Sequence, residues 1–155
     1  MANRTSSDVL VCGAGGFIGG WLVADLRSKG VTKIRAVDLK PLEQWYQRFN
    51  DVENLSLDLQ DRAACNRAIG NGVGELYNLA ADMGGMGFIE HNKGLCMLSV
   101  LINTHLLAAA RAAGVERYFF ASSACVYAAD KQTDPNVTAL KEEDAYPALP
   151  EDGYG

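Results

Sequence analysis

The sequence predicts an α/β fold built on a parallel β-sheet with helices on both faces. Short apolar runs of strand length alternate with longer segments whose apolar residues recur at helical spacing. The runs are almost continuously apolar, as expected for strands that are covered on both faces. Glycines, a carboxylate and a pair of serines follow the ends of these runs, which is where ligands bind in such sheets. These observations favour a doubly wound parallel sheet, and a length of 155 residues fits a single domain.

The elements follow from apolar runs and from the glycines that end them. Five short apolar runs, each followed by glycine or polar residues, are expected as strands: Asp8–Gly13, Lys33–Asp38, Asn54–Leu57, Val73–Ala80 and Glu116–Ser122. Four segments between them are expected as helices: Phe17–Lys29, Pro41–Phe49, Gln60–Ile69 and Asn92–Ala113. Three of these helices are expected to stop at Gly30, Gly70 and Gly114. Residues 81–88 form a glycine-rich loop, and residues 128–152 are expected to be mostly loop.

Charge and composition exclude several classes of function. A net charge of −5 counts against a nucleic acid or an anionic membrane as the main partner, because both bind basic surfaces. The four cysteines have neither metal-ligand nor disulfide spacing, and the N-terminus has no apolar leader. We therefore expect a cytoplasmic protein without a metal site. The longest apolar stretch, 94–110, is interrupted by Asn103, Thr104 and His105, which indicates a buried helix and not a membrane span.

A glycine motif joins the first expected strand to the first expected helix. Gly13, Gly16 and Gly19 match the spacing GxxGxxG. The free N–H groups and the dipole of a helix N-terminus favour a diphosphate, and the missing Cβ atoms let phosphate approach and let the helix pack on the strand. We therefore predict a dinucleotide-binding loop. The alternative is a tight strand–helix turn without a ligand.

Two carboxylates follow the next two strands. Asp38 ends the second strand, where a carboxylate accepts hydrogen bonds from both ribose hydroxyls of an adenosine and repels a 2′-phosphate. This favours NAD over NADP, although the nearby Lys40 weakens the argument, and the alternative is a strand-end turn residue. Asp58 follows the third strand; it is a candidate for contact with the adenine or else a turn or helix-capping residue.

These motifs carry a resemblance to a known family. The glycine motif, Asp38, the segment Leu79-Ala80-Ala81 and the pair Ser122-Ser123 resemble the extended short-chain dehydrogenase/reductases, which are Rossmann-type epimerases and dehydratases. The segments ADMGGMGFIE (81–90) and ASSACVY (121–127) resemble the GDP-mannose 3,5-epimerases within that family. The resemblance implies NAD as cofactor, a nucleotide sugar such as GDP-mannose as substrate and a homodimer. It places the cofactor against Gly13, Gly16, Phe17, Ile18, Gly19, Asp38, Asp58, Leu59, Leu79, Ala80 and Ala81.

The resemblance also implies the chemistry and the residues that perform it. In such epimerases, oxidation at carbon 4 of the sugar acidifies the neighbouring C–H bonds, an acid/base pair inverts carbons 3 and 5, and the hydride is returned. Tyr154 would remove the proton of the carbon-4 hydroxyl, Ser123 would hydrogen-bond its oxygen, and Cys125 would be one acid/base group. The substrate would contact Gly84, Gly85, Met86, Ser123, Ala124 and Cys125. From the residues alone, the alternative for Ser123 is a turn residue, and the alternative for Cys125 is a small buried apolar residue.

The sequence departs from the family in ways that leave the function open. The family's lysine falls at position 158, and its second acid/base group and substrate domain lie further downstream, so we expect an N-terminal fragment: an incomplete NAD-binding domain over 1–155, inactive alone. Ser99-Val100-Leu101 stands where the family has an asparagine. The alternatives are another nucleotide-sugar 4-epimerase or dehydratase, or a non-catalytic NAD-binding module.

Overall fold

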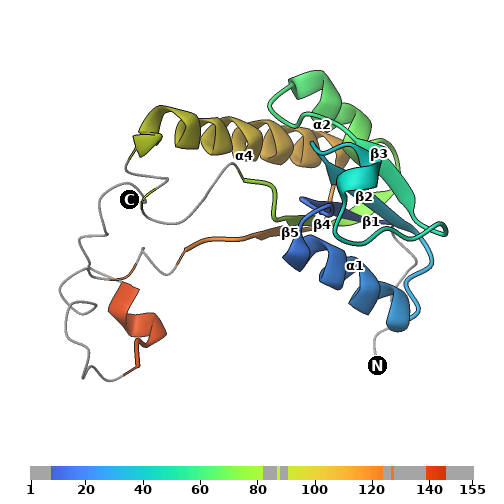
Figure 1. Ribbon diagram of the computed structural model, residues 1–155, viewed down its shortest axis with the longest axis horizontal. Coiled ribbons are helices and arrows are strands. Elements are labelled where there is room, and N and C mark those ends of the chain that lie inside the picture. The colour runs from blue at the N-terminus through green and yellow to red at the C-terminus, as the bar shows by residue number, and fades with distance from the viewer. Residues whose placement is uncertain (1–7, 82–86, 88–90, 124–126, 128–138, 146–155) are drawn as a thin grey trace.

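A computed structural model of the chain describes residues 8–81, 87, 91–123, 127 and 139–145 (Figure 1). Within these residues, five parallel strands form one sheet in the order β3-β2-β1-β4-β5. The strands are β1 (Asp8–Cys12), β2 (Ile34–Asp38), β3 (Glu53–Ser56), β4 (Val73–Asn78) and β5 (Arg117–Phe120). The predicted α/β fold with a parallel sheet is confirmed.

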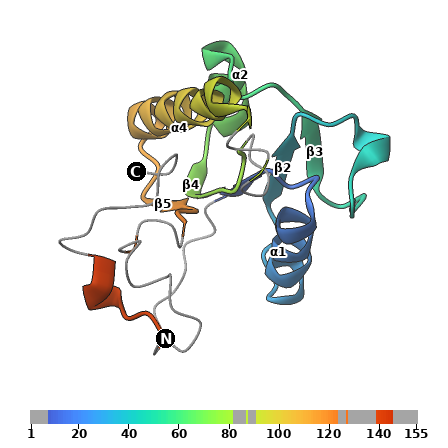
Figure 2. The ribbon, with the colours of Figure 1, turned by 60° about the vertical axis from the view of Figure 1, so that its left-hand side comes forward.

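Helices cover both faces of this sheet. Helix α1 (Phe17–Ser28) lies on one face, and α2 (Arg62–Ile69) and α4 (Lys93–Ala113) lie together on the other (Figures 1 and 2). Side chains alternate along β1 accordingly, since Leu10 and Cys12 pack with α2 and α4, whereas Val9 and Val11 pack with α1. Two short 3₁₀ helices, η1 (Leu42–Gln44) and η4 (Glu142–Ala145), complete the described elements.

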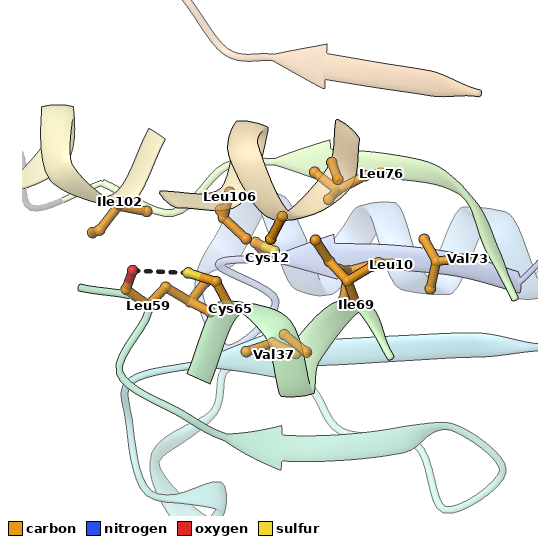
Figure 3. Close-up of a cluster of buried hydrophobic side chains, with 13 residues drawn as sticks. Leu10, Cys12, Val37, Leu59, Cys65, Ile69, Val73, Leu76, Ile102 and Leu106 are labelled. Carbon is orange, nitrogen blue, oxygen red and sulfur yellow. Dashed lines mark hydrogen bonds between the residues drawn. The ribbon is translucent and has the colours of Figure 1, made fainter. Parts of the chain in front are cut away.

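The larger core lies between the sheet and the helix pair α2 and α4. Figure 3 shows Ile102 and Leu106 from α4 and Cys65 and Ile69 from α2 meeting Leu10, Cys12, Val37 and Leu76 from the strands. All of these side chains are at most 7% exposed. This packing fixes the carboxyl ends of β1 and β4 relative to each other.

The strand order reverses between β1 and β4. The chain runs from β1 outward to β2 and β3, then crosses the sheet through α2 to β4 on the other side of β1. Cys12 lies opposite Val37 of β2 and Asn78 of β4. The two halves therefore diverge at the carboxyl end of β1, which is where doubly wound sheets bind their ligands.

One expected helix is wrong. The segment 41–49 contains only the single turn η1, and Trp45 and Tyr46 follow it in extended or irregular backbone. Instead of continuing the helix, the Trp45 ring packs against Gly15 and the Tyr46 N–H donates to the Gly15 carbonyl at 3.0 Å. Contacts with a distant loop therefore override the local helical pattern.

Helix α4 has nearly the expected length, but only one of its faces is buried, whereas the sequence indicated a buried helix. It ends at Gly114, which adopts φ = +74° and accommodates the left-handed turn of the C-cap. One face carries Ile102, Leu106 and Ala109 into the core, so α4 is part of the globular fold although its length and composition would also suit a membrane span. The other face is exposed within the described part of the chain, with Leu95, Met97, Val100, Leu101 and Leu107 between 38% and 65% accessible.

Candidate functional site

A cavity of about 340 Å³ opens at the carboxyl edge of the sheet. It collects residues that follow four different strands, together with one side chain of α4. The lining residues are Gly13, Gly16, Asp38, Leu39, Lys40, Asp58, Leu59, Gln60, Leu79, Ala80, Ala81 and Ile102. Eight of the eleven cofactor residues expected from the sequence are among them, and the other three (Phe17, Ile18 and Gly19) form the first turn of α1.

The glycine motif lets α1, the end of β1 and the turn after β4 approach one another more closely than residues with a Cβ would permit. A Cβ on Gly19 would lie 2.1 Å from the Gly13 carbonyl oxygen. Gly13 itself has φ = +80°, and a Cβ there would lie 2.8 Å from the Leu79 carbonyl. Both positions therefore require glycine, which fits the packing role that the spacing GxxGxxG predicts.

The first turn of α1 presents three amide groups that have no hydrogen-bond acceptor among the residues that the structure describes. The N–H groups of Gly13, Ala14, Gly15 and Gly16 all donate to nearby oxygen atoms. Those of Phe17, Ile18 and Gly19 have no acceptor among the described residues, and the N-cap residue Gly16 has no side chain to supply one. The first turn of α1 also contains no acidic residue. Three converging N–H groups at the positive end of a helix suit the two phosphates of a dinucleotide.

Asp38 is held rigidly at the rim of this loop. Its side chain is 9% exposed, Oδ2 accepts from the Gly15 N–H at 2.9 Å, and Oδ1 accepts from the Lys40 N–H at 3.0 Å. A carboxylate accepts about four hydrogen bonds, so Asp38 retains capacity for ribose hydroxyls. Gly15 lies outside the matched glycine spacing, and sequence reasoning missed it; the only signal was the additional glycine in the run Gly13-Ala14-Gly15-Gly16.

The part of the cavity that follows β3 is built from turns. Asp58 Oδ1 accepts a hydrogen bond from the Gln60 N–H at 2.9 Å, so Asp58 is a turn residue, one of the alternatives that the sequence allowed. The N-cap residue of α2 is Asp61 and not Asp58. The Leu59 side chain is buried in the core, and its carbonyl oxygen accepts from the Cys65 thiol (Figure 3). Both residues nevertheless line the cavity.

The turn after β4, which lines the cavity, is held by the buried side chain of Asn78. Asn78 is 2% exposed, its Oδ1 accepts from the Ala80 N–H at 3.1 Å, and its Nδ2 donates to Asn103 Oδ1 of α4. Asn78 Nδ2 also donates to the Tyr118 hydroxyl at 3.4 Å. Burial raises the pKa of Tyr118 to about 12. Ser99 is buried in α4 where the family's asparagine was expected, and Asn103 provides an amide one turn further along.

The residues expected to perform catalysis are described only in part. Ser123 is half-buried three residues after the end of β5. Gly84, Gly85, Met86, Ala124, Cys125 and Tyr154 lie outside the described residues. Two other cysteines are core residues: burial raises the pKa of the Cys12 thiol well above its usual range and that of Cys65 to about 11, so both stay protonated at neutral pH.

A second, larger cleft of about 400 Å³ lies at the opposite edge of the sheet. Arg27, Thr32 and Asp51 contribute to its lining. The Arg27 guanidinium is paired with Asp51 at 2.8 Å and lies over the Phe49 ring at 4.2 Å. Because this cation is already neutralised, the cleft offers an anionic ligand less than the first turn of α1 does.

Comparison with known proteins identifies the family to which the chain belongs. The model of the NAD dependent epimerase/dehydratase family matches residues 9–155. The chain belongs to this family. NAD is the family's dinucleotide, and three features of the cavity fit it: the amides of residues 17–19, which lack an acceptor in the described part of the chain, the glycine contacts and the Asp38 carboxylate.

Individual members of the epimerase/dehydratase family are similar over nearly all of the chain. GDP-mannose 3,5-epimerase 1 of Oryza sativa subsp. japonica is 45% identical over 148 residues, which cover 95% of this chain and 38% of the relative. GDP-mannose 3,5-epimerase of Arabidopsis thaliana is 40% identical, over 95% of this chain and 39% of the relative. The structure of Thermus thermophilus UDP-glucose 4-epimerase with NAD is 27% identical with a TM-score of 0.77, over 95% of this chain and 46% of that one. The chain thus spans less than half of the length of each.

Proposed function

We propose that residues 1–155 form the NAD-binding part of a nucleotide-sugar epimerase that inverts carbons 3 and 5 of GDP-mannose. The observation that carries the proposal is the 45% identity to a GDP-mannose 3,5-epimerase over 95% of the chain. It is supported by the segments DMGGMGF (82–88) and SSAC (122–125), which resemble those enzymes.

The chain's own groups would hold the cofactor at three points. The amides of Phe17, Ile18 and Gly19 would bind the two phosphates, because they have no acceptor within the described residues. Asp38 would accept the ribose hydroxyls and disfavour a 2′-phosphate. The turns at Asp58 and Ala80 would enclose the adenine and the remainder of the dinucleotide.

Epimerisation would then depend on proton transfer by residues after β5. NAD, when bound, supplies reversible hydride exchange at carbon 4. Tyr154 would move the proton of the carbon-4 hydroxyl while Ser123 holds its oxygen, and Cys125 would exchange a proton at carbon 3 or 5. Gly84, Gly85, Met86 and Ala124 would contact the sugar without the bulk of large polar side chains.

We also propose that the functional protein is a homodimer that pairs through α4. The outer face of this helix exposes Met97, Val100 and Leu107 by 56–65%, and apolar patches of this kind mark interaction sites. Leu107→Glu should shift the intact protein from dimer to monomer in size-exclusion chromatography with light scattering. The control Asn66→Glu adds the same charge at an exposed position of α2, outside this patch, and it should leave the dimer intact.

The decisive experiment is turnover of GDP-mannose by the intact protein in heavy water. Deuterium at carbons 3 and 5 of the recovered sugar is the expected result, because each inversion exchanges a proton with solvent. Cys125→Ser should reduce this exchange strongly, whereas Cys96→Ser, which removes a half-buried thiol of α4, should not. Labelling at neither carbon would exclude the proposal.

The main competing function is 4-epimerisation of another nucleotide sugar. It is favoured by the TM-score of 0.77 to a UDP-glucose 4-epimerase. Such a reaction needs no proton exchange at carbons 3 and 5, so turnover of UDP-glucose without deuterium would identify it. Binding of NAD without turnover of either sugar would indicate a non-catalytic module.

A further inference from the structure

A segment that follows β2 closes over the glycine loop from outside. Trp45 is 8% exposed, and its ring packs so tightly on Gly15 that a Cβ there would lie 2.9 Å from the ring atoms Cδ1 and Cγ. The Tyr46 N–H donates to the Gly15 carbonyl oxygen at 3.0 Å, and the Tyr46 ring meets Phe17 edge-on at 4.9 Å. We call residues 45–46 the loop clamp.

The loop clamp completes the hydrogen bonding of Gly15. The Gly15 N–H donates to Asp38 and the Gly15 carbonyl accepts from Tyr46. Both backbone polar groups of Gly15 are therefore hydrogen-bonded within the protein. The clamp thus supports the arrangement in which, among residues 13–19, the amides of residues 17–19 have no acceptor within the described part of the chain.

A second chain of hydrogen bonds runs from Trp45 to the carboxylate that faces the cavity. The indole Nε1–H donates to the Lys40 carbonyl at 2.9 Å, and the Lys40 N–H donates to Asp38 Oδ1 at 3.0 Å. Lys40 also lines the cavity. The indole N–H therefore anchors the turn that carries both the Asp38 carboxylate and the Lys40 ammonium group.

We propose that Trp45 is a positioning residue that sets the selectivity of this site for NAD over NADP. It acts through Lys40 on Asp38 and does not itself line the cavity. Without the indole N–H, the turn 38–40 loses one of its two anchors, the carboxylate is held less firmly against the ribose, and the Lys40 ammonium is freer to meet a 2′-phosphate. The inference rests on the proposed binding of NAD at this cavity.

The test uses Trp45→Phe in the intact protein, with NAD and NADP affinities measured by calorimetry. Phenylalanine keeps an aromatic ring against Gly15 and removes the N–H donor. One lost hydrogen bond of about 0.5–1.5 kcal/mol corresponds to roughly a 2- to 13-fold change, so we expect weaker NAD binding by that factor and a smaller ratio of NAD to NADP affinity. Trp21→Phe, at an exposed position of α1, should change neither.

The outcomes separate this inference from the proposed function. If the wild type does not bind NAD, the proposed function fails. If it binds NAD and Trp45→Phe lowers the melting temperature while the affinity ratio stays constant, Trp45 has only a structural role and the inference is wrong. If the variant does not fold, NMR of the wild-type protein tests the inference instead. The indole N–H resonance of Trp45 should shift on addition of NAD, whereas that of Trp21 should not. An unmoved Trp45 resonance would overturn the inference.

Discussion

Gly19→Ala tests the closest contact in the site. The added Cβ would lie 2.1 Å from the Gly13 carbonyl oxygen and 2.7 Å from Ala14 Cα, whereas ordinary contact begins near 3.4 Å. Both atoms belong to the backbone, so no change of rotamer relieves the overlap, and α1 must move away from β1 by about 1 Å. Overpacking of this kind costs about 1–3 kcal/mol, from which the better helix propensity of alanine returns up to about 1 kcal/mol.

We therefore expect the free energy of unfolding to fall by about 1 kcal/mol in urea titrations of the intact protein. NAD affinity should fall at least about tenfold, because hydrogen bonds to the amides of residues 17–19 do not tolerate a displacement of about 1 Å. Gly94→Ala is the matched control: its Cβ would meet nothing within 4 Å, and it should be neutral or stabilising. A Gly19→Ala protein with wild-type stability and NAD affinity would refute the close packing described for this loop.

Three further predictions concern stability and thiol chemistry. Asp61→Ala removes the side-chain acceptor of the Ala63 and Ala64 N–H groups and should lower the free energy of unfolding by about 1 kcal/mol; an unchanged urea midpoint would show that the cap contributes nothing. Cys12 and Cys65 should resist iodoacetamide in the native protein while the partly exposed Cys96 reacts, and peptide mass spectrometry showing Cys12 alkylated as fast as Cys96 would contradict this. Burial raises the pKa of Cys65 from 9.0 to about 11, so the stability that this thiol contributes is complete below pH 9 and is lost as the pH rises toward 11. Cys65→Ala should therefore reduce the fall in the free energy of unfolding between pH 9 and 11. An identical fall in the variant would contradict this prediction.

The sheet and most helices could be predicted because their limits are set locally. Helices stop at Gly30, Gly70 and Gly114, and all three adopt the positive φ that favours glycine. Buried strands show as apolar runs regardless of their neighbours. The chain order of elements and the edge of the sheet that carries the cavity followed from these signals.

The loop clamp could not be predicted because its structure depends on contacts distant in sequence. Residues 41–49 carry a helical pattern, but Trp45 gains more by packing on Gly15, thirty positions earlier, than by continuing the helix. The binding of Asp38 to the Gly15 amide was missed for the same reason, since the motif spacing does not include Gly15. The roles of Cys125 and Tyr154 stay predictions, because both lie outside the described residues.

The amides of the first turn of α1 should bind the phosphates of NAD. Titration of ¹⁵N-labelled intact protein with NAD, followed by backbone amide NMR, tests it directly. We expect the largest shifts at Phe17, Ile18 and Gly19. Unmoved resonances at these three residues, with the largest shifts around Arg27, Thr32 and Asp51 in the opposite cleft, would contradict it.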